Sequence, residues 1–593
     1  MGFLITKSLF VDYRKFPKLA WLRVNDMARY RKATKTESDD MQEYIIELGK
    51  TVEKLVGEYL VHKHGVDLFN AFPDIPEEDS WRSDDDDTWV ADMSFRERLT
   101  QNLARTRDAI VRWEKIIYQP GFQVGDCYVR WDYLVRNENG RYDLIEVKAK
   151  SSVRKKMKDN GEDRKIGKIE DEFLHDVAFQ KYIINQTLNS LWQWEIDKIF
   201  IAHVNSDYVR RGRINIDGII SFQDVWGIRS ISVIQSNRPK SVSIDDSLET
   251  ESNIQAYIDL MRTELALAEE DFWVLHPFPG NKYLEYFGAD KPFGTIYSIP
   301  IHHSRAPLIA QAARENRIDI SALSQEEMGW IGTEAGNFID KYFRSESEPC
   351  IEETEIVSGL IALQFPICFY DYESVSTPIP LLDWISPYQQ AVVQYSLHKL
   401  FEDGHIEHYW AVLVWEWELQ ITDVTDMDDP NIESQKNRIV IGSQKDFLQL
   451  FLADIGDHLN TSSFVVWYKP FENSRNKEIG KSYSDLEDSF LKINDMTYDL
   501  YDPFSEYKYF DRRFQGSASI KKVLPILVPG LSYEHLNIGK WDKAMNKLAE
   551  LIRGDISDTE SRIQTAKDLL VYCRQDSWAM VAIYRKLLNA LNP

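Results

Sequence analysis

Apolar and polar residues alternate in two neighbouring segments of the first half of the chain, residues 127–136 (CYVRWDYLVR) and 141–150 (RYDLIEVKAK). Such alternation predicts strands with one buried face, and the intervening NENG is typical of a hairpin turn. Helical spacing predicts helices before the pair and another helix over residues 175–192, after a charged stretch at 148–168. We therefore expect a core of helices, paired strands and a covering helix.

Apolar runs in the second half predict a different order of elements. Residues 365–374 (FPICFYDYES) are typical of a buried strand. Further strands are expected at 390–401, 407–418 and 462–469, with a helix over 445–460 before the last of them. A strand meander followed by a helix, a strand and more helices predicts a mixed α/β sheet flanked by helices.

The length of the chain and its acidic runs indicate several regions. A chain of 593 residues is too long for one hydrophobic core, since domains contain about 150 residues. Acidic runs at 72–89 and 243–252 are typical of loops or linkers, and residues 253–354 are mostly helical in pattern with Pro and Gly breaks. We expect three regions, at 1–242, 243–360 and 361–593.

The composition is that of a globular protein, with 43% hydrophobic residues, 12% aromatic residues and 17 tryptophans. The formal net charge of −25 argues against a general nucleic-acid coat, because nonspecific binding depends on Lys and Arg that neutralise phosphates. The four cysteines form no C-x-x-C pair, and no apolar stretch reaches the roughly 18 residues of a membrane span. We expect a soluble protein of a reducing compartment, the cytoplasm, that does not associate with a membrane.

The segment DLIEVKAK carries the first candidate site. Glu146 and Lys148 project from the same face of the predicted strand, and Asp132 on the neighbouring strand can lie beside Glu146. Two carboxylates and an ammonium group suit phosphodiester hydrolysis, because carboxylates hold Mg²⁺ and a lysine orients the attacking water. An exposed hairpin with a surface ion pair is the alternative, since E-x-K occurs by chance about three times in so acidic a chain.

Two features beside this segment support the interpretation as a nuclease. Gln180 and Tyr182 lie on the predicted helix at 175–192, which can cover the site. The basic run KAKSSVRKKMK supplies candidate contacts to phosphates at Lys150, Arg154, Lys155 and Lys156.

This order of residues resembles the RecB-like nucleases of the PD-(D/E)XK class, including those linked to CRISPR adaptation. The resemblance places Asp132, Glu146 and Lys148 at the metal-binding and catalytic positions. It places Gln180 and Tyr182 in the helical motif of the class.

The same resemblance bears on a further metal ligand and on a cofactor. In ELGKTVEKL, Glu53 stands four residues after Gly49, where the class usually has a histidine, and is a further candidate ligand. Many relatives carry four cysteines for an iron–sulfur cluster, which needs its thiolates. Here Phe16 precedes Pro17 at the first of these places, and YFGADKPFGTIYS lacks cysteine, so we expect no iron–sulfur cluster.

Acidic residues at three separate places form a second candidate site. Asp371 and Glu373 lie two residues apart at the end of an apolar strand and share one face, although a charged strand edge is the alternative. Glu472 follows the strand FVVWYK, and Asp576 lies in VYCRQDSWAM near the C-terminus. Four carboxylates can share two divalent ions about 4 Å apart. Tyr572, one helical turn before Asp576, can position the water nucleophile.

The order D-x-E, then F-E after a strand, then Y-x-x-x-D resembles the DnaQ-like, DEDDy type of 3′-to-5′ exonuclease with the ribonuclease H-like fold. That family usually has Asp where Glu472 stands and Asn near Lys469, and Asp499 is the alternative ligand. The two halves together resemble an uncharacterised bacterial family that fuses a RecB-like domain to a DnaQ-like domain. The stretches SPYQQAVVQYSLH, GSASIKKVLP and LSYEHLNIG match that family as well.

The expected fold is therefore α/β. It contains an N-terminal PD-(D/E)XK core of the αβββα type, a helical segment, and a C-terminal DnaQ-type mixed sheet flanked by helices. The expected function is a metal-dependent nuclease that uses Mg²⁺ or Mn²⁺ to hydrolyse DNA, and the resemblance implies DNA repair or defence against foreign DNA. An RNA 3′-to-5′ exonuclease is the enzymatic alternative, and a scaffold that binds nucleic acid or protein through inactivated nuclease folds is the non-enzymatic one.

Overall fold

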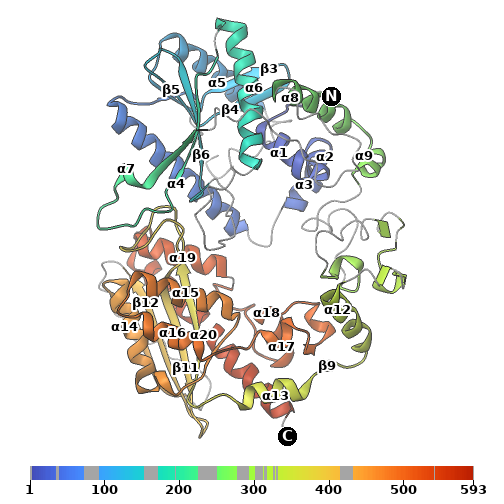
Figure 1. Ribbon diagram of the computed structural model, residues 1–593, viewed down its shortest axis with the longest axis vertical. Coiled ribbons are helices and arrows are strands. Elements are labelled where there is room, and N and C mark those ends of the chain that lie inside the picture. The colour runs from blue at the N-terminus through green and yellow to red at the C-terminus, as the bar shows by residue number, and fades with distance from the viewer. Residues whose placement is uncertain are drawn as a thin grey trace, which may run out of the picture. The chain divides into compact units, whose positions relative to one another are not determined.

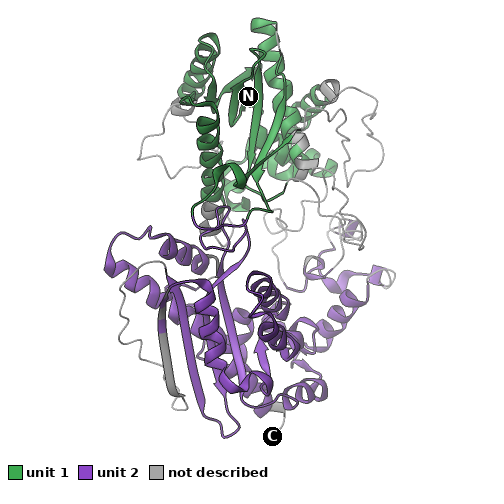
Figure 2. Ribbon diagram, turned by 60° about the vertical axis from the view of Figure 1, so that its left-hand side comes forward, with its two compact units in different colours: residues 1–208, 213–290 green, residues 209–212, 291–593 purple. Residues whose placement is uncertain are grey.

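The structure is a computed structural model that describes residues 3–34, 39–72, 93–152, 171–193, 195–224, 250–276, 293–300, 311–312, 315, 317–324, 327–328, 332–414, 432–539 and 541–591. It divides into two compact units, unit 1 with residues 1–208 and 213–290 and unit 2 with residues 209–212 and 291–593 (Figure 2). Both units combine helices with β-sheets (Figure 1), which confirms the predicted mixed α/β class.

A six-stranded sheet in the order β1-β2-β5-β6-β7-β8 forms the centre of unit 1. The predicted hairpin is present as β5 and β6, which pair antiparallel, whereas β6 and β7 pair parallel. The strands of this sheet are β1 (Phe69–Asn70), β2 (Ile116–Tyr118), β5 (Tyr133–Arg136), β6 (Tyr142–Lys148), β7 (Ile199–Val204) and β8 (Ile220–Asp224).

The segment expected as one strand at 127–136 is two strands in different sheets. β4 (Cys127–Arg130) pairs with β3 (Gly121–Val124) in a separate two-stranded sheet, while β5 joins the central sheet. Between β4 and β5 lies Trp131, which is fully buried and whose backbone N–H donates to the carbonyl of Pro120 before β3. Asp132 therefore precedes β5 instead of lying within a strand.

Helices cover the sheet of unit 1. They are α1 (Lys7–Lys15), α2 (Pro17–Asn25), α3 (Met27–Thr34), α4 (Asp39–His64), α5 (Met93–Val111), α6 (Asp171–Trp192), α7 (Ile216–Ile219), α8 (Thr250–Leu265) and α9 (Glu269–Leu275). The side-chain oxygen of Thr6 caps α1 by accepting the N–H of Leu9. Pro17 begins α2, where its missing N–H costs no helical hydrogen bond.

The packing of α8 explains why the segment expected as a separate region at 243–360 is divided between the two units, near residue 290. The buried residues of α8 recur at helical spacing and form one apolar stripe, Ile254, Tyr257, Ile258, Met261 and Leu265. This stripe belongs to the core of unit 1, and α8 packs against α6 and α2. Burial of the stripe therefore assigns α8 to unit 1.

The central sheet of unit 2 has the order β13-β12-β11-β10-β14-β15. β10, β11 and β12 form an antiparallel meander, and β14 and β15 pair parallel beside β10. The strands are β10 (Ile367–Val375), β11 (Ala391–Leu400), β12 (Ile406–Val414), β13 (Ile432–Ile441), β14 (Phe464–Val466) and β15 (Thr497–Asp499). Two short strands, β9 (Cys350–Ile351) and β16 (Tyr509–Phe510), pair with each other.

Two strands of this sheet were outside the expected order. β13 begins with the polar stretch IESQKNR, so its sequence lacks the apolar run that identifies β10 to β12. β15 has only three residues, which is too short for a periodic pattern to indicate a strand.

The helices of unit 2 are α12 (Thr333–Arg344), α13 (Glu353–Ile361), α14 (Gln444–Ile455), α15 (Lys469–Ser482), α16 (Glu487–Asp495), α17 (Asp502–Ser505), α18 (Ile520–Leu527), α19 (Trp541–Arg553) and α20 (Thr559–Leu591). Across the described residues of both units, no helix is apolar over a length sufficient to cross a membrane.

Helices α14 and α20 lie on opposite faces of the unit 2 sheet. Tyr395 of β11 donates to Asp454 of α14 at 2.5 Å, whereas its neighbour Gln394 donates to the Leu569 carbonyl of α20 at 2.8 Å. Side chains alternate between faces along a strand, so these two contacts assign one helix to each face. The α20 face is the one that carries the acidic residues of β10, because Glu373 pairs in register with Gln394.

We predict that Met261→Ala destabilises unit 1 and spares unit 2. Met261 is fully buried in the α8 stripe, and its truncation leaves a cavity that costs about 2–5 kcal/mol. Hydrogen exchange should show lost protection in α6 and β5 to β7 and unchanged protection in β10 to β12. Met580→Ala, which truncates a fully buried methionine of α20, should show the reverse. Equal loss in both units for either variant would contradict the division.

Candidate functional sites

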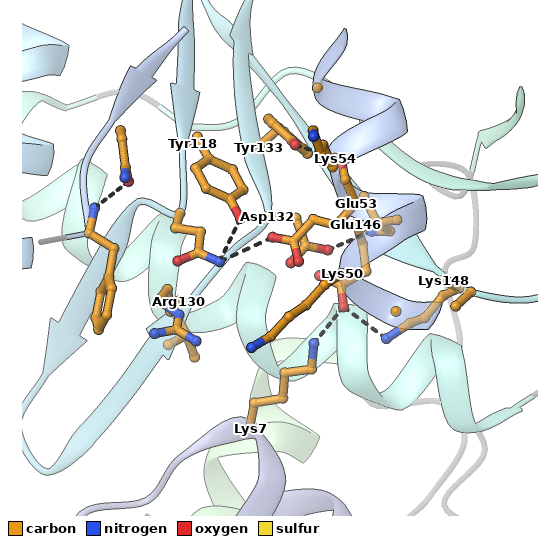
Figure 3. A pocket seen from close by; sticks show the side chains of 18 of the residues that line it. Lys7, Lys50, Glu53, Lys54, Tyr118, Arg130, Asp132, Tyr133, Glu146 and Lys148 are labelled. Atoms are coloured by element: carbon orange, nitrogen blue, oxygen red, sulfur yellow. Dashed lines mark hydrogen bonds and ion pairs between the residues drawn. The ribbon is translucent and has the colours of Figure 1, made fainter. Parts of the chain in front are cut away.

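Unit 1 contains a cavity of about 1090 Å³ between its N-terminal helices and the central sheet (Figure 3). Four carboxylates line it, Glu53 and Glu58 from α4, Asp132 from the turn before β5 and Glu146 from β6. Basic side chains line it as well, Lys7, Lys50, Lys54, Arg130 and Lys148. The structure thus brings together Asp132, Glu146 and Lys148 with Glu53, the further candidate ligand named from the sequence.

Glu146 is the most heavily bonded carboxylate of this cavity, and its side chain is 1% exposed. Its Oε1 accepts from the ammonium groups of Lys7 at 2.5 Å and Lys148 at 2.8 Å. Its Oε2 accepts from the Gln180 amide at 3.4 Å. The predicted same-face pair of Glu146 and Lys148 is therefore in direct contact, and Gln180 of α6 covers it as expected.

Asp132 and Glu53 reach the cavity from different elements. The Oδ2 of Asp132 accepts the N–H of Val147 at 2.6 Å, and the Oε1 of Glu53 accepts from the Gln119 amide at 3.1 Å. Burial and the nearby charges of Glu146 and Glu53 raise the pKa of Asp132 well above its usual value. Burial also raises the pKa of Glu53. The ionised forms of these groups require a compensating cation.

Lys7 and Asp176 belong to the site but were outside the sequence prediction. Asp176 of α6 is buried, and its carboxylate accepts from Lys148 at 2.5 Å and from Gln180 at 2.8 Å. Asp176 lies one helical turn before Gln180, and this i, i+4 spacing is the signal that sequence offered for it. Lys7 lies 139 residues from Glu146, and no local pattern indicates that contact.

The remaining predicted residues of unit 1 lie elsewhere. The Tyr182 hydroxyl donates to Gln255 of α8 at 2.5 Å, so Tyr182 faces α8 and does not line the cavity. The ammonium group of Lys150 lies 4.6 Å from the ring centre of Phe173. Arg154, Lys155 and Lys156 lie outside the described residues.

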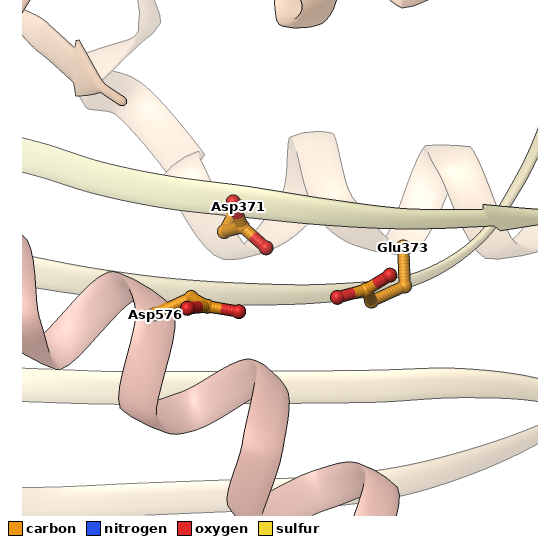
Figure 4. A group of neighbouring side chains, drawn as sticks. All are labelled: Asp371, Glu373 and Asp576. Carbon is orange, nitrogen blue, oxygen red and sulfur yellow. The ribbon is translucent and has the colours of Figure 1, made fainter. Parts of the chain in front are cut away.

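In unit 2, Asp371, Glu373 and Asp576 form a compact carboxylate group (Figure 4). Each offers one carboxylate oxygen, and these oxygens all lie within 4.8 Å of one another. Asp371 and Glu373 share a face of β10, as the D-x-E spacing predicts, and α20 presents Asp576 to that face. Glu373 is buried, whereas Asp371 and Asp576 are partly exposed, so the group has a side open to solvent.

Burial and mutual repulsion disfavour the charged forms of this group. Burial and the charges of Asp576 and Glu472 raise the pKa of both Asp371 and Glu373 well above their usual values. Burial raises the pKa of Asp576 to about 6, against the hydrogen bond from Tyr533 and the charge of Lys521. A divalent cation would neutralise this cluster.

Two tyrosines and a lysine surround Asp576. The Tyr533 hydroxyl donates to Asp576 Oδ1 at 2.6 Å, and Tyr572 also hydrogen-bonds to the Asp576 side chain. Lys521 donates to the Tyr572 hydroxyl at 3.3 Å, and its ammonium group lies 5.1 Å from the ring centre of Tyr572 and 5.4 Å from that of Tyr533. Tyr572 is thus beside the carboxylate group, as the sequence predicts.

Lys521 and Tyr533 were assigned no role from the sequence. They lie in GSASIKKVLP and LSYEHLNIG, two of the stretches on which the resemblance to the fused family rests. Their presence in those stretches was the signal in the sequence that could have indicated a role at the site.

Glu472 does not belong to the compact carboxylate group. It lies in the first turn of α15, is 2% exposed, and accepts the backbone N–H of Tyr372, a residue of β10 between Asp371 and Glu373. Burial raises its pKa well above the usual value. Its other oxygen, Oε2, has no hydrogen-bond partner in the described part of the chain.

Asp499, the alternative ligand, accepts hydrogen bonds from the backbone. Its carboxylate accepts the N–H groups of Tyr468 at 2.9 Å, Lys469 at 2.7 Å and Tyr501 at 3.1 Å. These bonds fix the chain at the start of α15. Asp499 therefore holds the loop beside Glu472 instead of joining the carboxylate group.

Comparisons with known proteins match part of the second half. Residues 368–519 match a family described as "Domain of unknown function (DUF2779)". This segment contains Asp371, Glu373 and Glu472 but ends before Tyr533 and Asp576.

Proteins of Mycoplasma and Ureaplasma are similar to part of the chain. The chain is 27% identical over 241 residues to "Uncharacterized protein MG366 homolog" of Mycoplasma pneumoniae. This match covers 36% of this chain and 31% of that protein. The chain is 25% identical over 232 residues to "Uncharacterized protein UU173" of Ureaplasma parvum, which covers 36% of this chain and 30% of that protein. The matches thus span about a third of the length of these curated relatives. No solved structure matches the chain.

We predict that Lys7→Met lowers the stability of metal-free unit 1 and increases the stabilisation that Mn²⁺ gives it. Glu146 and Asp176 would lose one of their two ammonium partners, at a cost of about 1–3 kcal/mol, and the position beside Glu146 would open to a cation. Thermal unfolding in EDTA and in Mn²⁺ measures both effects.

Lys50→Met is the matched control for Lys7→Met. Lys50 lines the same cavity, but among the described residues the hydrogen bonds to Glu146 come from Lys7, Lys148 and Gln180 and not from Lys50. An Mn²⁺ shift of equal size in Lys7→Met, Lys50→Met and the parent would show that Lys7 does not compete for a metal position.

In unit 2, we predict that Mn²⁺ increases the protection of β10 and α20 from hydrogen exchange and that Asp371→Asn abolishes the increase. A free Mn²⁺ concentration of a hundred times the Kd stabilises the folded, metal-bound state by about 2.7 kcal/mol. Without metal, Asp371→Asn should be at least as stable as the parent, because it removes one repelling charge.

Asp454→Asn is the control for the metal experiment. Asp454 is a buried carboxylate on the α14 face, where Tyr395 and Arg438 donate to it. This variant should lose stability and keep the response to Mn²⁺. A response that survives in Asp371→Asn would contradict a metal site at the carboxylate group.

Proposed function

We propose that this protein is a metal-dependent nuclease that hydrolyses phosphodiester bonds of nucleic acid. The compact group of Asp371, Glu373 and Asp576, with three carboxylate oxygens within 4.8 Å of one another, is the observation that carries the proposal. Within the described ranges no salt bridge to these three carboxylates is present, so their charged forms are costly, and a bound cation would offset that cost.

The arrangement of elements supports the finer fold assignments that belong to this proposal. In unit 2, an antiparallel meander of β10, β11 and β12 is followed by α14, β14, α15 and β15, with α20 on the acidic face. This order supports a ribonuclease H-like fold of the DnaQ type. In unit 1, helices precede the β5–β6 hairpin and the covering helix α6, and β7 then pairs parallel with β6. This order supports a PD-(D/E)XK fold.

The donor set fits Mg²⁺ or Mn²⁺. Carboxylate oxygens are the hard ligands that these ions prefer, and the solvent-exposed side of the group leaves room for water and phosphate. An ion bound there would supply Lewis-acid polarisation of the phosphodiester.

The residues around the carboxylate group of unit 2 have separate roles in this proposal. Tyr572 orients the attacking water through its hydroxyl, and Lys521 holds that hydroxyl in place. Tyr533 fixes the orientation of the Asp576 carboxylate.

The cavity of unit 1 supports a second site of the same chemistry. Asp132, Glu146 and Glu53 would hold the ion, while Lys148 orients the attacking water. Asp176 and Gln180 position the Lys148 ammonium and the Glu146 carboxylate.

The charge of the cavity indicates the substrate. Five basic side chains line it beside four carboxylates, so Lys and Arg are concentrated there relative to a chain of net charge −25. A polyanion such as a nucleic-acid backbone is attracted by such a concentration of Lys and Arg. DNA, in repair or in defence against foreign DNA, is the proposed substrate on the strength of the family resemblance, with RNA as the enzymatic alternative.

Two observations favour a second candidate function, a nucleic-acid-binding scaffold. Lys7 and Lys148 both contact Glu146 Oε1, and Glu472 lies outside the carboxylate group of unit 2. A chain in which both sites had lost their metals would retain the basic cavity and bind without cleaving.

Cleavage assays separate these functions. We predict that the parent with Mn²⁺ cleaves end-labelled DNA, and that Lys148→Met and Asp371→Asn each reduce one set of products by about 100-fold or more. The double variant should be inactive. Single- and double-stranded DNA and RNA are tested in parallel, which identifies the preferred polymer.

Two variants control for these substitutions. Lys198→Met changes an exposed lysine of unit 1 that does not line the cavity, and Asp457→Asn changes an exposed aspartate of unit 2 outside the carboxylate group. Both should retain the activity of the parent. Undiminished cleavage by the double variant, or no cleavage of any polymer by the parent, would refute the nuclease proposal, and binding without cleavage would favour the scaffold.

A further inference from the structure

Tyr468 holds an uncommon backbone conformation in an exposed place. It precedes α15 with φ 81° and ψ 67°, in the left-handed region, and its side chain is 50% exposed. A side chain at Cβ makes this region unfavourable, so Gly or Asn is the usual occupant. Backbone strain of this kind persists only where the surrounding structure imposes it, and it concentrates at functional sites.

Asp499 imposes the conformation. Its Oδ1 accepts the N–H of Tyr468 at 2.9 Å, and its Oδ2 accepts the N–H of Lys469 at 2.7 Å. The same carboxylate holds Tyr501 through its N–H at 3.1 Å. Asp499 is itself only 6% exposed, so these bonds fix the backbone of both tyrosines in a solvent-shielded place.

Aromatic neighbours support the Tyr468 ring. The ring of Tyr501 lies 5.5 Å from it at 78°, an edge-to-face contact. Trp467 contacts Tyr501 at 6.2 Å and stacks on Phe504 at 5.4 Å, and its indole N–H donates to the Ala518 carbonyl at 3.2 Å. The ring that solvent reaches is therefore backed by a fixed aromatic cluster.

The start of α15 adjoins the carboxylate group. β14 runs parallel to β10 with Val465 opposite Phe369, so the chain after β14 reaches the acidic half of β10. Four residues after Tyr468, Glu472 accepts the N–H of Tyr372, which lies between the two acidic residues of β10. The exposed ring is thus held at the end of β10 where Asp371 and Glu373 lie.

We propose that Tyr468 is a stacking platform for an unpaired nucleobase next to the phosphodiester bond that the carboxylate group cleaves. This inference rests on the proposed nuclease function and names its substrate as a single strand, DNA or RNA. Aromatic rings bind single strands without sequence preference, because every base has a flat face to stack. The fixed backbone places the ring before the substrate arrives, so little freedom is lost on binding.

The test measures binding by the full-length double variant Lys148→Met with Asp371→Asn, which does not cleave. Fluorescence anisotropy compares single-stranded oligonucleotides with all bases present against ones with an abasic site at one of the last three positions of the 3′ end. The intact strand should bind about tenfold tighter than one of the abasic strands. Adding Tyr468→Gly should reduce that ratio to about twofold or less, and adding Tyr468→Trp should restore it.

Stability and a matched control exclude a folding effect. Gly takes the left-handed conformation freely, so Tyr468→Gly should melt no lower than the background. Trp113→Gly removes a 53% exposed aromatic residue of unit 1 that also has a positive φ, 57°, and it should leave the ratio unchanged.

The outcomes separate the two proposals. A full base preference in Tyr468→Gly, equal loss in Trp113→Gly, or no binding of any strand would overturn the stacking role. Cleavage by the parent together with an unchanged preference in Tyr468→Gly would leave the nuclease proposal intact and reject the platform. Base-dependent binding that Tyr468→Gly removes, without cleavage by the parent, would support the platform and reject the nuclease proposal.

Discussion

Electrostatic repulsion among Asp371, Glu373 and Asp576 is the constraint on which the structure of unit 2 depends. Their oxygens converge within 4.8 Å, which disfavours ionisation of all three. The packing of α20 on β10 places Asp576 there, and the Tyr533 hydroxyl holds its carboxylate. A buried contact beside it fixes the position of the helix, since Ser577 lies 2.6 Å from Ser396 of β11 through their hydroxyl oxygens. The helix cannot slide along the sheet without breaking this pair.

The polar character of the α20 face continues away from the carboxylates. The rings of His398 and His408 stack at 4.2 Å, and His398 Nδ1 lies 3.0 Å from the Ser577 hydroxyl. Burial lowers the pKa of His408 to about 3, so its ring is neutral at physiological pH. The opposite face is packed by Phe447 and Phe451 of α14. The two faces of one sheet thus differ in chemical character, because the α20 face carries buried polar groups and aromatic rings pack on the α14 face.

Unit 1 is organised by ion pairs and aromatic contacts of its first helices. Lys7 of α1 reaches Glu146 of β6, so the N-terminal helix forms one wall of the cavity. Phe16, at the position where the resemblance places a cysteine, packs against the core of unit 1. Nearby, Trp21 of α2 lies 5.2 Å from Trp273 of α9. Aromatic packing and hydrogen bonds therefore join α1 and α2 to α8 and α9 in the described part of this unit.

Sequence by itself determined the features that follow from local periodicity. Alternation placed Glu146 with Lys148 and Asp371 with Glu373 on shared faces, and helical spacing placed Tyr572 beside Asp576. These relations depend on backbone geometry over a few residues. The domain boundaries, the break in the strand before Asp132 and the strand β13 did not follow from such patterns.

Only the tertiary structure decided which distant groups meet. Lys7 contacts Glu146 across 139 residues, and Tyr533 contacts Asp576 across 43. The tertiary structure also places Glu472 outside the carboxylate group, and it places Asp499 where its carboxylate accepts the backbone N–H of Tyr468. A periodic pattern fixes the face that a side chain takes, whereas the separation between two faces depends on how the elements pack, and that packing is set by the whole chain.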